Sequence, residues 1–117
     1  MLESGPAIKV SIHLNRDTGA MHGFLVDEII AFLRRSGIKG ATMLQAHAGF
    51  GAHGRLHTEG AGDVAGLHLP VVIYFIEEQQ KVDGILDVLL SMVTDGLIEA
   101  HPTTILKNIT SSERVIS

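Results

Sequence analysis

An unbroken apolar run lies past the middle of the chain: Leu69-Pro70-Val71-Val72-Ile73-Tyr74-Phe75-Ile76. Neighbouring residues of a strand point to opposite faces, so a strand formed from this run would be apolar on both faces. Such runs are typical of central strands that are covered on both sides. We therefore predict a strand over residues 69–76 in the middle of a sheet.

The residues after this run predict a helix and then an edge strand. Glu77 and Glu78 place acids where a helix would begin, at the positive end of its dipole. Apolar residues then recur with the helical period, and Gly96 is expected to end the helix. The stripe consists of Val82, Ile85 or Leu86, Leu89 and Val93. Residues 97–106 read as a final strand, and Pro102 places it at an edge because proline lacks the backbone donor.

The residues before the run predict a strand, a helix and a second strand. Residues 7–14 alternate between apolar and polar side chains, which indicates a half-buried strand. Its apolar face consists of Ile8, Val10, Ile12 and Leu14. A helical period runs from about residue 21 to residue 36, after a turn in which Asp17 or Thr18 would cap the helix. Residues 41–48 form the second strand.

The resulting order is βαββαβ, which predicts an α+β, ferredoxin-like sandwich. Its antiparallel four-stranded sheet has the strand order 4-1-3-2, with two helices on one face. The second apolar face of strand 69–76 would then need another cover, which we expect to be an oligomer. We treat residues 1–117 as a single domain, with a core over about 7–107 and a frayed C-terminal tail, 108–117.

A glycine-rich stretch, residues 48–68, separates the second predicted strand from the apolar run. It has no helical or strand period, and structureless stretches of this length are usually functional loops. Glycines allow close approach of the backbone to a ligand, while arginine and histidine supply donors. The candidate ligand-binding residues are Gly49, Phe50, Gly51, His53, Arg55 and His57. The literal G-x-G-x-x-G pattern at residues 49–54 is not followed by a helical period, so we do not read it as a dinucleotide fingerprint.

Composition narrows the class of function. The chain has no cysteine, which excludes thiol catalysis and suits a reducing, cytoplasmic location. A net charge of −4 argues against nucleic-acid binding. We find no apolar run long enough for membrane insertion. No serine, histidine or carboxylate grouping forms a nucleophile and base, so we assign no catalytic residue and expect a protein that is not an enzyme.

Several motifs occur together in this order: Gly49-Phe50-Gly51, a basic stretch with Arg55 and His57, Leu69-Pro70-Val71-Val72, and Glu77-Glu78. In these motifs the chain resembles the family catalogued as domain of unknown function 190, which is grouped with the PII-like signalling proteins. The resemblance covers about residues 7 to 107. It implies a homotrimer whose sheets pack inward and whose inter-subunit clefts bind an adenine nucleotide such as AMP, ADP or ATP, with no required cofactor. It also implies that the 48–68 loop contacts a partner, such as a membrane transporter, a channel or an enzyme.

Two other functions remain open at this point. The chain could be a divalent-metal-binding trimer of the copper-tolerance type, which shares this architecture, or a small phosphate-handling enzyme. His47, His53 and His57 cluster around the loop, but an i, i+4 spacing brings two histidines together only on a helix, so we assign no metal site. His13 and His101 fall opposite the apolar faces of their strands, where we expect structural or interface roles.

Overall fold

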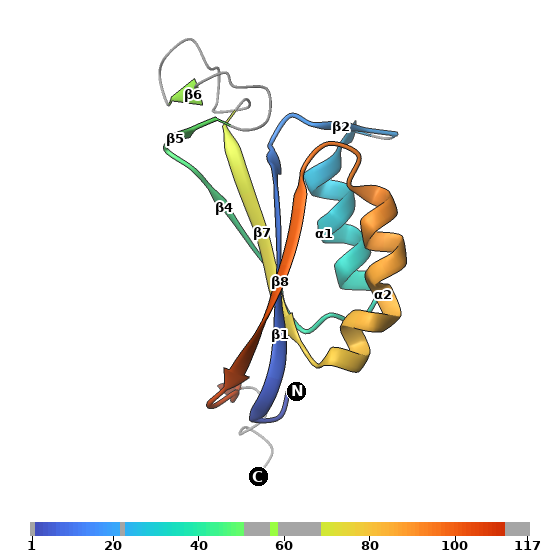
Figure 1. Ribbon diagram of the computed structural model, residues 1–117, viewed down its shortest axis with the longest axis vertical. Helices are drawn as coiled ribbons and strands as arrows, with labels where there is room; N and C mark the ends of the chain where they lie inside the picture. The colour runs from blue at the N-terminus through green and yellow to red at the C-terminus, as the bar shows by residue number, and fades with distance from the viewer. Residues whose placement is uncertain (1, 22, 51–56, 59–68, 112–117) are drawn as a thin grey trace.

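A computed structural model describes residues 2–21, 23–50, 57–58 and 69–111 of the protein. The described residues form two helices, which lie against one face of a twisted sheet, and no other described element covers the opposite face (Figure 1). Within the described part of the chain, neither helix is long and apolar enough to span a membrane.

The main sheet has four antiparallel strands in the order β4-β7-β1-β8. They are β1 (Gly5–Asn15), β4 (Thr42–Gln45), β7 (Pro70–Glu77) and β8 (Leu97–Ile105). The helices are α1 (Leu25–Arg35) and α2 (Gln79–Met92). The predicted ferredoxin-like order, the central place of strand 69–76 and the edge position of the strand with Pro102 are all confirmed.

Two short hairpins complete the described structure. One pairs β2 (Gly19–Ala20) with β3 (Gly23–Phe24), and the other pairs β5 (Ala48–Gly49) with β6 (His57–Thr58). The first hairpin lies directly before α1, and the second lies at the base of the glycine-rich loop.

The core lies between the sheet and the helices. Alternate residues of β7, namely Val71, Ile73 and Phe75, are buried against this layer. The apolar residues of the two helices supply the other side, with Ile29 of α1 and Leu89 of α2, a member of the predicted stripe, fully buried. The apolar residues that recur every 3.6 positions in the helices thus pack against those that recur every two positions in the strand, and together they form one core cluster.

The opposite face of the sheet, which we call the open face, carries the other alternate residues. Directly opposed residues of antiparallel strands share a face, so the register fixes its membership. Tyr74 lies opposite Ser11, which lies opposite Glu99, and Val72 lies opposite His13, which lies opposite Leu97. The open face therefore includes Lys9, Ser11, His13, Thr42, Leu44, Val72, Tyr74, Ile76, Leu97, Glu99 and His101. Val72, Tyr74 and Ile76 are only half-buried in the single chain.

The N-terminal boundary of α1 differs from the prediction. The helix begins at Leu25 instead of about Met21, because the preceding residues form the first hairpin. The predicted side-chain cap by Asp17 or Thr18 is wrong as well: the N-cap residue is Phe24, and the backbone oxygen of Thr18 accepts a hydrogen bond from the Leu25 N–H.

The boundaries around α2 and β4 also differ. Glu77 is the last residue of β7 and not part of the helix start, and α2 ends at Met92, before Gly96. The second predicted strand is shorter than residues 41–48, because β4 ends at Gln45. Of the predicted frayed tail, Asn108 donates a 3.3 Å hydrogen bond to the Leu2 carbonyl, and residues 112–117 lie outside the described residues.

Candidate functional site

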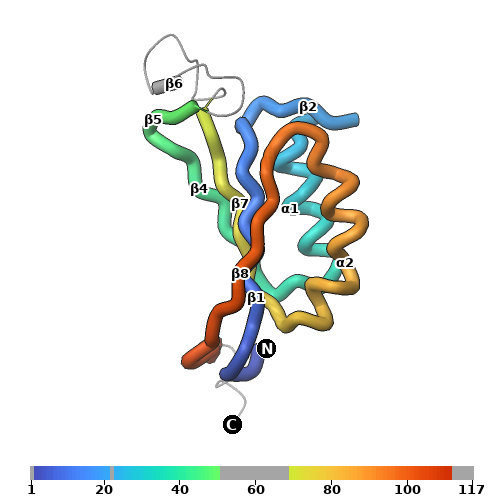
Figure 2. The backbone as a smooth tube through the Cα atoms, viewed as in Figure 1, coloured from blue at the N-terminus to red at the C-terminus, as the bar shows by residue number. Residues whose placement is uncertain are grey.

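A cavity of about 570 Å³ opens at the end of the sheet from which the glycine-rich loop leaves. We call it the loop-end pocket. Figure 2 shows the ends of β1 and β7, the α2–β8 connection and β5 together at this end. Its described lining consists of His13, Leu14, Asn15, Thr18, Phe50, Pro70, Asp95, Gly96, Leu97 and Glu99.

Backbone contacts hold the walls of this pocket. The Arg16 N–H donates to the Leu69 carbonyl at 3.1 Å, and the Ala46 N–H donates to the Pro70 carbonyl at 2.9 Å. Gly96 lies against β1 so closely that a Cβ there would be 2.6 Å from the His13 carbonyl oxygen. The glycine is therefore needed for close approach of two backbones, and it positions the α2–β8 connection against β1.

The chemistry of the loop-end pocket is apolar and acidic. Leu14, Pro70 and Leu97 give it an apolar wall, and the aromatic side chain of Phe50, which is 70% exposed, also lines it. Its carboxylates are Asp95 and Glu99, and its described lining contains no lysine or arginine. Such a pocket suits a flat, apolar group that carries hydrogen-bond donors.

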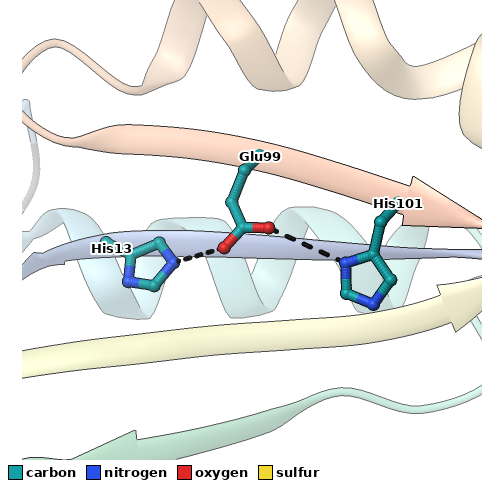
Figure 3. A network of polar contacts seen from close by, with 3 residues as sticks. All are labelled: His13, Glu99 and His101. Carbon is teal, nitrogen blue, oxygen red and sulfur yellow. Dashed lines mark hydrogen bonds and ion pairs between the residues drawn. The ribbon is translucent and has the colours of Figure 1, made fainter.

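Glu99 lies between two histidines, as Figure 3 shows. His13 Nε2 is 3.1 Å from Glu99 Oε2, and His101 Nδ1 is 3.8 Å from Glu99 Oε1. Each histidine thus approaches a different carboxylate oxygen. In the part of the chain that the structure describes, no three histidine, aspartate or glutamate side chains are arranged to hold a metal ion.

The sequence placed His13 and His101 correctly on the face opposite the apolar sets, but it did not identify Glu99 as their partner. Glu99 and His101 are two residues apart on β8, a spacing that places both on one face. His13 joins them through the β1–β8 register, in which it lies opposite Leu97. From the sequence, only the pairing of Glu99 with His101, two residues apart on one strand, could have been found.

The predicted loop residues are described in part. Gly49 pairs with His57 in the second hairpin, so these two candidates lie together, and Phe50 reaches the loop-end pocket. A Cβ on Gly49 would be 3.1 Å from Pro70 Cγ, so this glycine also serves a close approach. Gly51, His53 and Arg55 lie outside the described residues.

A second cavity, of about 320 Å³, lies at the opposite end of the sheet, where β7 and β8 finish. We call it the lysine pocket, because Lys39 and Lys107 line it together with Tyr74, and its described lining contains no carboxylate. Lys9 Nζ lies 4.5 Å from the centroid of the Tyr74 ring. The described lining of this pocket therefore carries positive charge, which suits an anionic group.

The position of Lys39 depends on Glu77, a residue that the sequence predicts at the start of a helix. Glu77 is 3% exposed, and its Oε2 accepts a 2.9 Å hydrogen bond from the Lys39 N–H. The buried carboxylate thereby anchors the segment between α1 and β4 against the end of β7.

Comparison with known proteins gives a family and a fold. The family model DUF190, described as an uncharacterized ACR, matches residues 7–105. A structure of CPII, a nitrogen regulatory PII-like protein from Thiomonas intermedia K12 bound to ADP, AMP and bicarbonate, is 20% identical with a TM-score of 0.62, and the match covers 89% of this chain and 99% of that one.

Two further structures match at similar levels. The apo form of CPII is 18% identical with a TM-score of 0.57, covering 88% of this chain and 95% of its own. A PII-like protein from Thermus thermophilus is 18% identical with a TM-score of 0.58, covering 89% of this chain and 91% of its own. At these identities the likeness shows a shared PII-like fold.

Proposed function

The chain belongs to the DUF190 family, and on that basis we propose that it is a PII-like regulatory protein that binds an adenine nucleotide at clefts between its subunits. AMP, ADP and ATP are the ligands proposed, and the 48–68 loop is the element presented to a partner. A structural neighbour, CPII, has been solved with ADP and AMP, which supports this class of ligand.

The observation that carries the proposal is the opposite chemistry of the two pockets. A nucleotide has a flat base with donor groups at one end and anionic phosphates at the other. The loop-end pocket offers an aromatic ring and carboxylates, and the lysine pocket offers Lys39 and Lys107. These pockets lie at opposite ends of one sheet, because Asn15 pairs with Pro70 at one end and Gly5 pairs with Ile105 at the other.

One chain therefore does not present both pockets to the same nucleotide. A second copy placed against the open face would bring its lysine pocket toward the loop-end pocket of the first. The base would then lie on Phe50, and the phosphates would meet the lysines of the neighbouring copy together with Arg55 and His57 of the loop. Bidentate and charge-assisted hydrogen bonds to phosphate favour this arrangement.

The open face supports assembly as a homotrimer. Val72, Tyr74 and Ile76 form an apolar row on the central strand, and neither helix of the described residues covers them (Figure 1). Burial of such a row between identical copies is the usual way in which a sheet face of this kind is covered.

Regulation would follow from the loop. Phe50, which belongs to the 48–68 loop and directly follows Gly49 of β5, lines the loop-end pocket. A nucleotide that binds one loop conformation more tightly than another shifts the loop toward the first conformation. The partner of this cytoplasmic signalling protein would be a membrane transporter, a channel or an enzyme, and the chain itself would act by binding, without catalysis.

Isothermal titration with AMP, ADP and ATP tests the proposal. The wild-type oligomer should bind at least one of them. Lys107→Ala should weaken the binding of ATP by about 1.5–3 kcal/mol if the ammonium contacts a phosphate. Lys81→Ala is the matched control, because Lys81 lies on α2 and lines neither pocket, and it should leave affinity unchanged. A wild-type protein that binds none of the three nucleotides would refute the proposal.

Loop variants test the same function from the other side of the cleft. Arg55→Ala should weaken binding by about 1.5–3 kcal/mol, and Arg55→Lys should restore part of it, since lysine lacks the bidentate fork. Gly49→Val should abolish binding and leave the oligomer intact, because a β-branched side chain would press on Pro70. Equal affinities for wild type and all three variants would show that the loop takes no part in the site.

A further inference from the structure

The carboxylate of Glu99 is held in place at the edge of the loop-end pocket. Both Glu99 and His13 line that pocket, and the 3.1 Å contact between His13 Nε2 and Glu99 Oε2 lies inside its lining (Figure 3). His101, which is not among the described lining residues, approaches Oε1 from the other side. The Glu99 side chain is nevertheless 48% exposed, so its oxygens keep free directions toward a ligand.

The groups around Glu99 define what such a ligand must carry. An ionised carboxylate can only accept hydrogen bonds. On the open face, the ammonium of Lys9 lies over the Tyr74 ring, and in the described lining of the loop-end pocket the other carboxylate is Asp95. The described lining is therefore favourable to a donor group and unfavourable to an acceptor or an anion at this position.

Phe50 and Glu99 line the same pocket, so a base that stacks on Phe50 would lie in the cavity that this carboxylate borders. Stacking on an aromatic side chain is tolerant of base identity, so the ring alone does not distinguish purines. The group at purine position 6 does distinguish them: in adenine it is an amino group, which donates, and in hypoxanthine and guanine it is an oxygen, which accepts.

We propose that Glu99 is the residue that selects a 6-aminopurine over a 6-oxopurine. The inference rests on the proposed nucleotide-binding function and identifies the residue that distinguishes one base from another. The Glu99 carboxylate accepts a hydrogen bond from the exocyclic amine, whereas a 6-oxo group would face it with no proton between the two oxygens. Sites built to pair with a donor discriminate against analogues that lack it. His13 and His101 act as positioning residues that fix the two carboxylate oxygens.

AMP and IMP form a matched pair of ligands, because they differ in the substituent at position 6 and its adjoining ring proton. Isothermal titration should show that the wild-type oligomer prefers AMP by about tenfold, the factor expected for one hydrogen bond of about 1.4 kcal/mol. Glu99→Gln should reduce this ratio to about one, because an amide can donate to the 6-oxo group as well as accept from the amine. Asp87→Asn, the control at an exposed carboxylate of α2 that lines neither pocket, should keep the wild-type ratio.

The histidines supply a second readout. His101→Ala removes a contact to Glu99 from outside the described pocket lining and should lower the AMP preference by less than Glu99→Gln does. It should leave the affinity for IMP unchanged, which a general loss of folding would not. Thermal melting of each variant checks that the fold is retained.

Three results would overturn the assignment of Glu99. They are an unchanged AMP to IMP ratio in Glu99→Gln, a ratio that collapses equally in Asp87→Asn, and equal binding of AMP and IMP by the wild type. A wild-type protein that discriminates AMP from 2′-deoxy-AMP but not from IMP would place the carboxylate on the ribose and also overturn it. If the wild type binds none of the nucleotides, including ADP and ATP, the proposed function fails and this inference fails with it.

Discussion

Glu77 shows how one buried carboxylate connects two parts of the chain. It accepts the Lys39 N–H at 2.9 Å from a position that is 3% exposed. Glu77→Ala should lower the free energy of unfolding by about 1–3 kcal/mol, because it leaves a backbone donor without its partner. Glu77→Gln should lower it less, since the amide oxygen can still accept. Denaturant titration of the three proteins measures the difference, and equal midpoints would contradict this role.

Gly96 and Gly84 make a second comparison at the residue scale. A Cβ at Gly96 would meet the His13 carbonyl oxygen at 2.6 Å, whereas a Cβ at Gly84, inside α2, would meet nothing within 4 Å. Gly96→Ala should therefore destabilise the fold, because two backbones must separate. Gly84→Ala should stabilise it by about 0.5–1 kcal/mol through helix propensity. Thermal unfolding should show midpoints that move in opposite directions, and a parallel shift would contradict this packing of the α2–β8 connection.

At the scale of elements, the two faces of β7 have different roles. Val71 is 1% exposed and packs toward the helices, whereas its neighbour Val72 lies half-buried on the open face. Val71→Ala should lower the free energy of unfolding by about 2–3 kcal/mol, from lost burial and the cavity left behind. Val72→Ala should have a smaller effect at protein concentrations at which the chain is monomeric. The same unfolding experiment on both variants tests this, and equal losses would contradict the assignment of faces.

The two helix starts show why element boundaries were harder to predict than the elements themselves. Most of the apolar stripe that predicted α2 is buried, namely Val82, Ile85 and Leu89, whereas Val93 lies past the end of the helix and is half-buried. The residues predicted to cap the helices or to place charge at their starts, however, belong to neighbouring elements. The backbone oxygen of Thr18 accepts a hydrogen bond from the Leu25 N–H across the first hairpin, and Glu77 is the last residue of β7. Tertiary hydrogen bonds outweighed these local preferences, which are individually worth about 1 kcal/mol or less.

At the scale of the whole molecule, the open face is the surface through which the proposed oligomer would assemble. Val72→Lys should dissociate the proposed oligomer, because an unpaired charge buried between copies is costly. Val88→Lys is the matched control, since Val88 lies on α2 and is already 50% exposed. Light scattering should give a lower mass for the first variant and the wild-type mass for the second. A monomeric wild type at micromolar concentration would contradict the prediction.

The loop-end pocket could be predicted from the sequence only in part. Gly49 and Phe50 were recognised from glycine content and from the resemblance to a known family, and Phe50 does line the pocket. Asp95, Gly96 and Glu99 were not predicted as residues of the pocket, because they follow a helix without forming any motif of their own. They reach the pocket only because β8 pairs with β1 and carries the end of α2 to the same edge.

The sequence by itself determined the order of elements, the central place of β7 and the one-sided helical layer, because hydrophobic periodicity is local and each period matches one kind of element. Only the tertiary structure decided which set of β7 side chains faces the helices, how Glu99 comes to lie between His13 and His101, and why Glu77 is buried. These features depend on strand register and on contacts between residues far apart in the chain. A shift of one residue in register would turn every such side chain to the other face, and the local sequence of a strand does not determine its register.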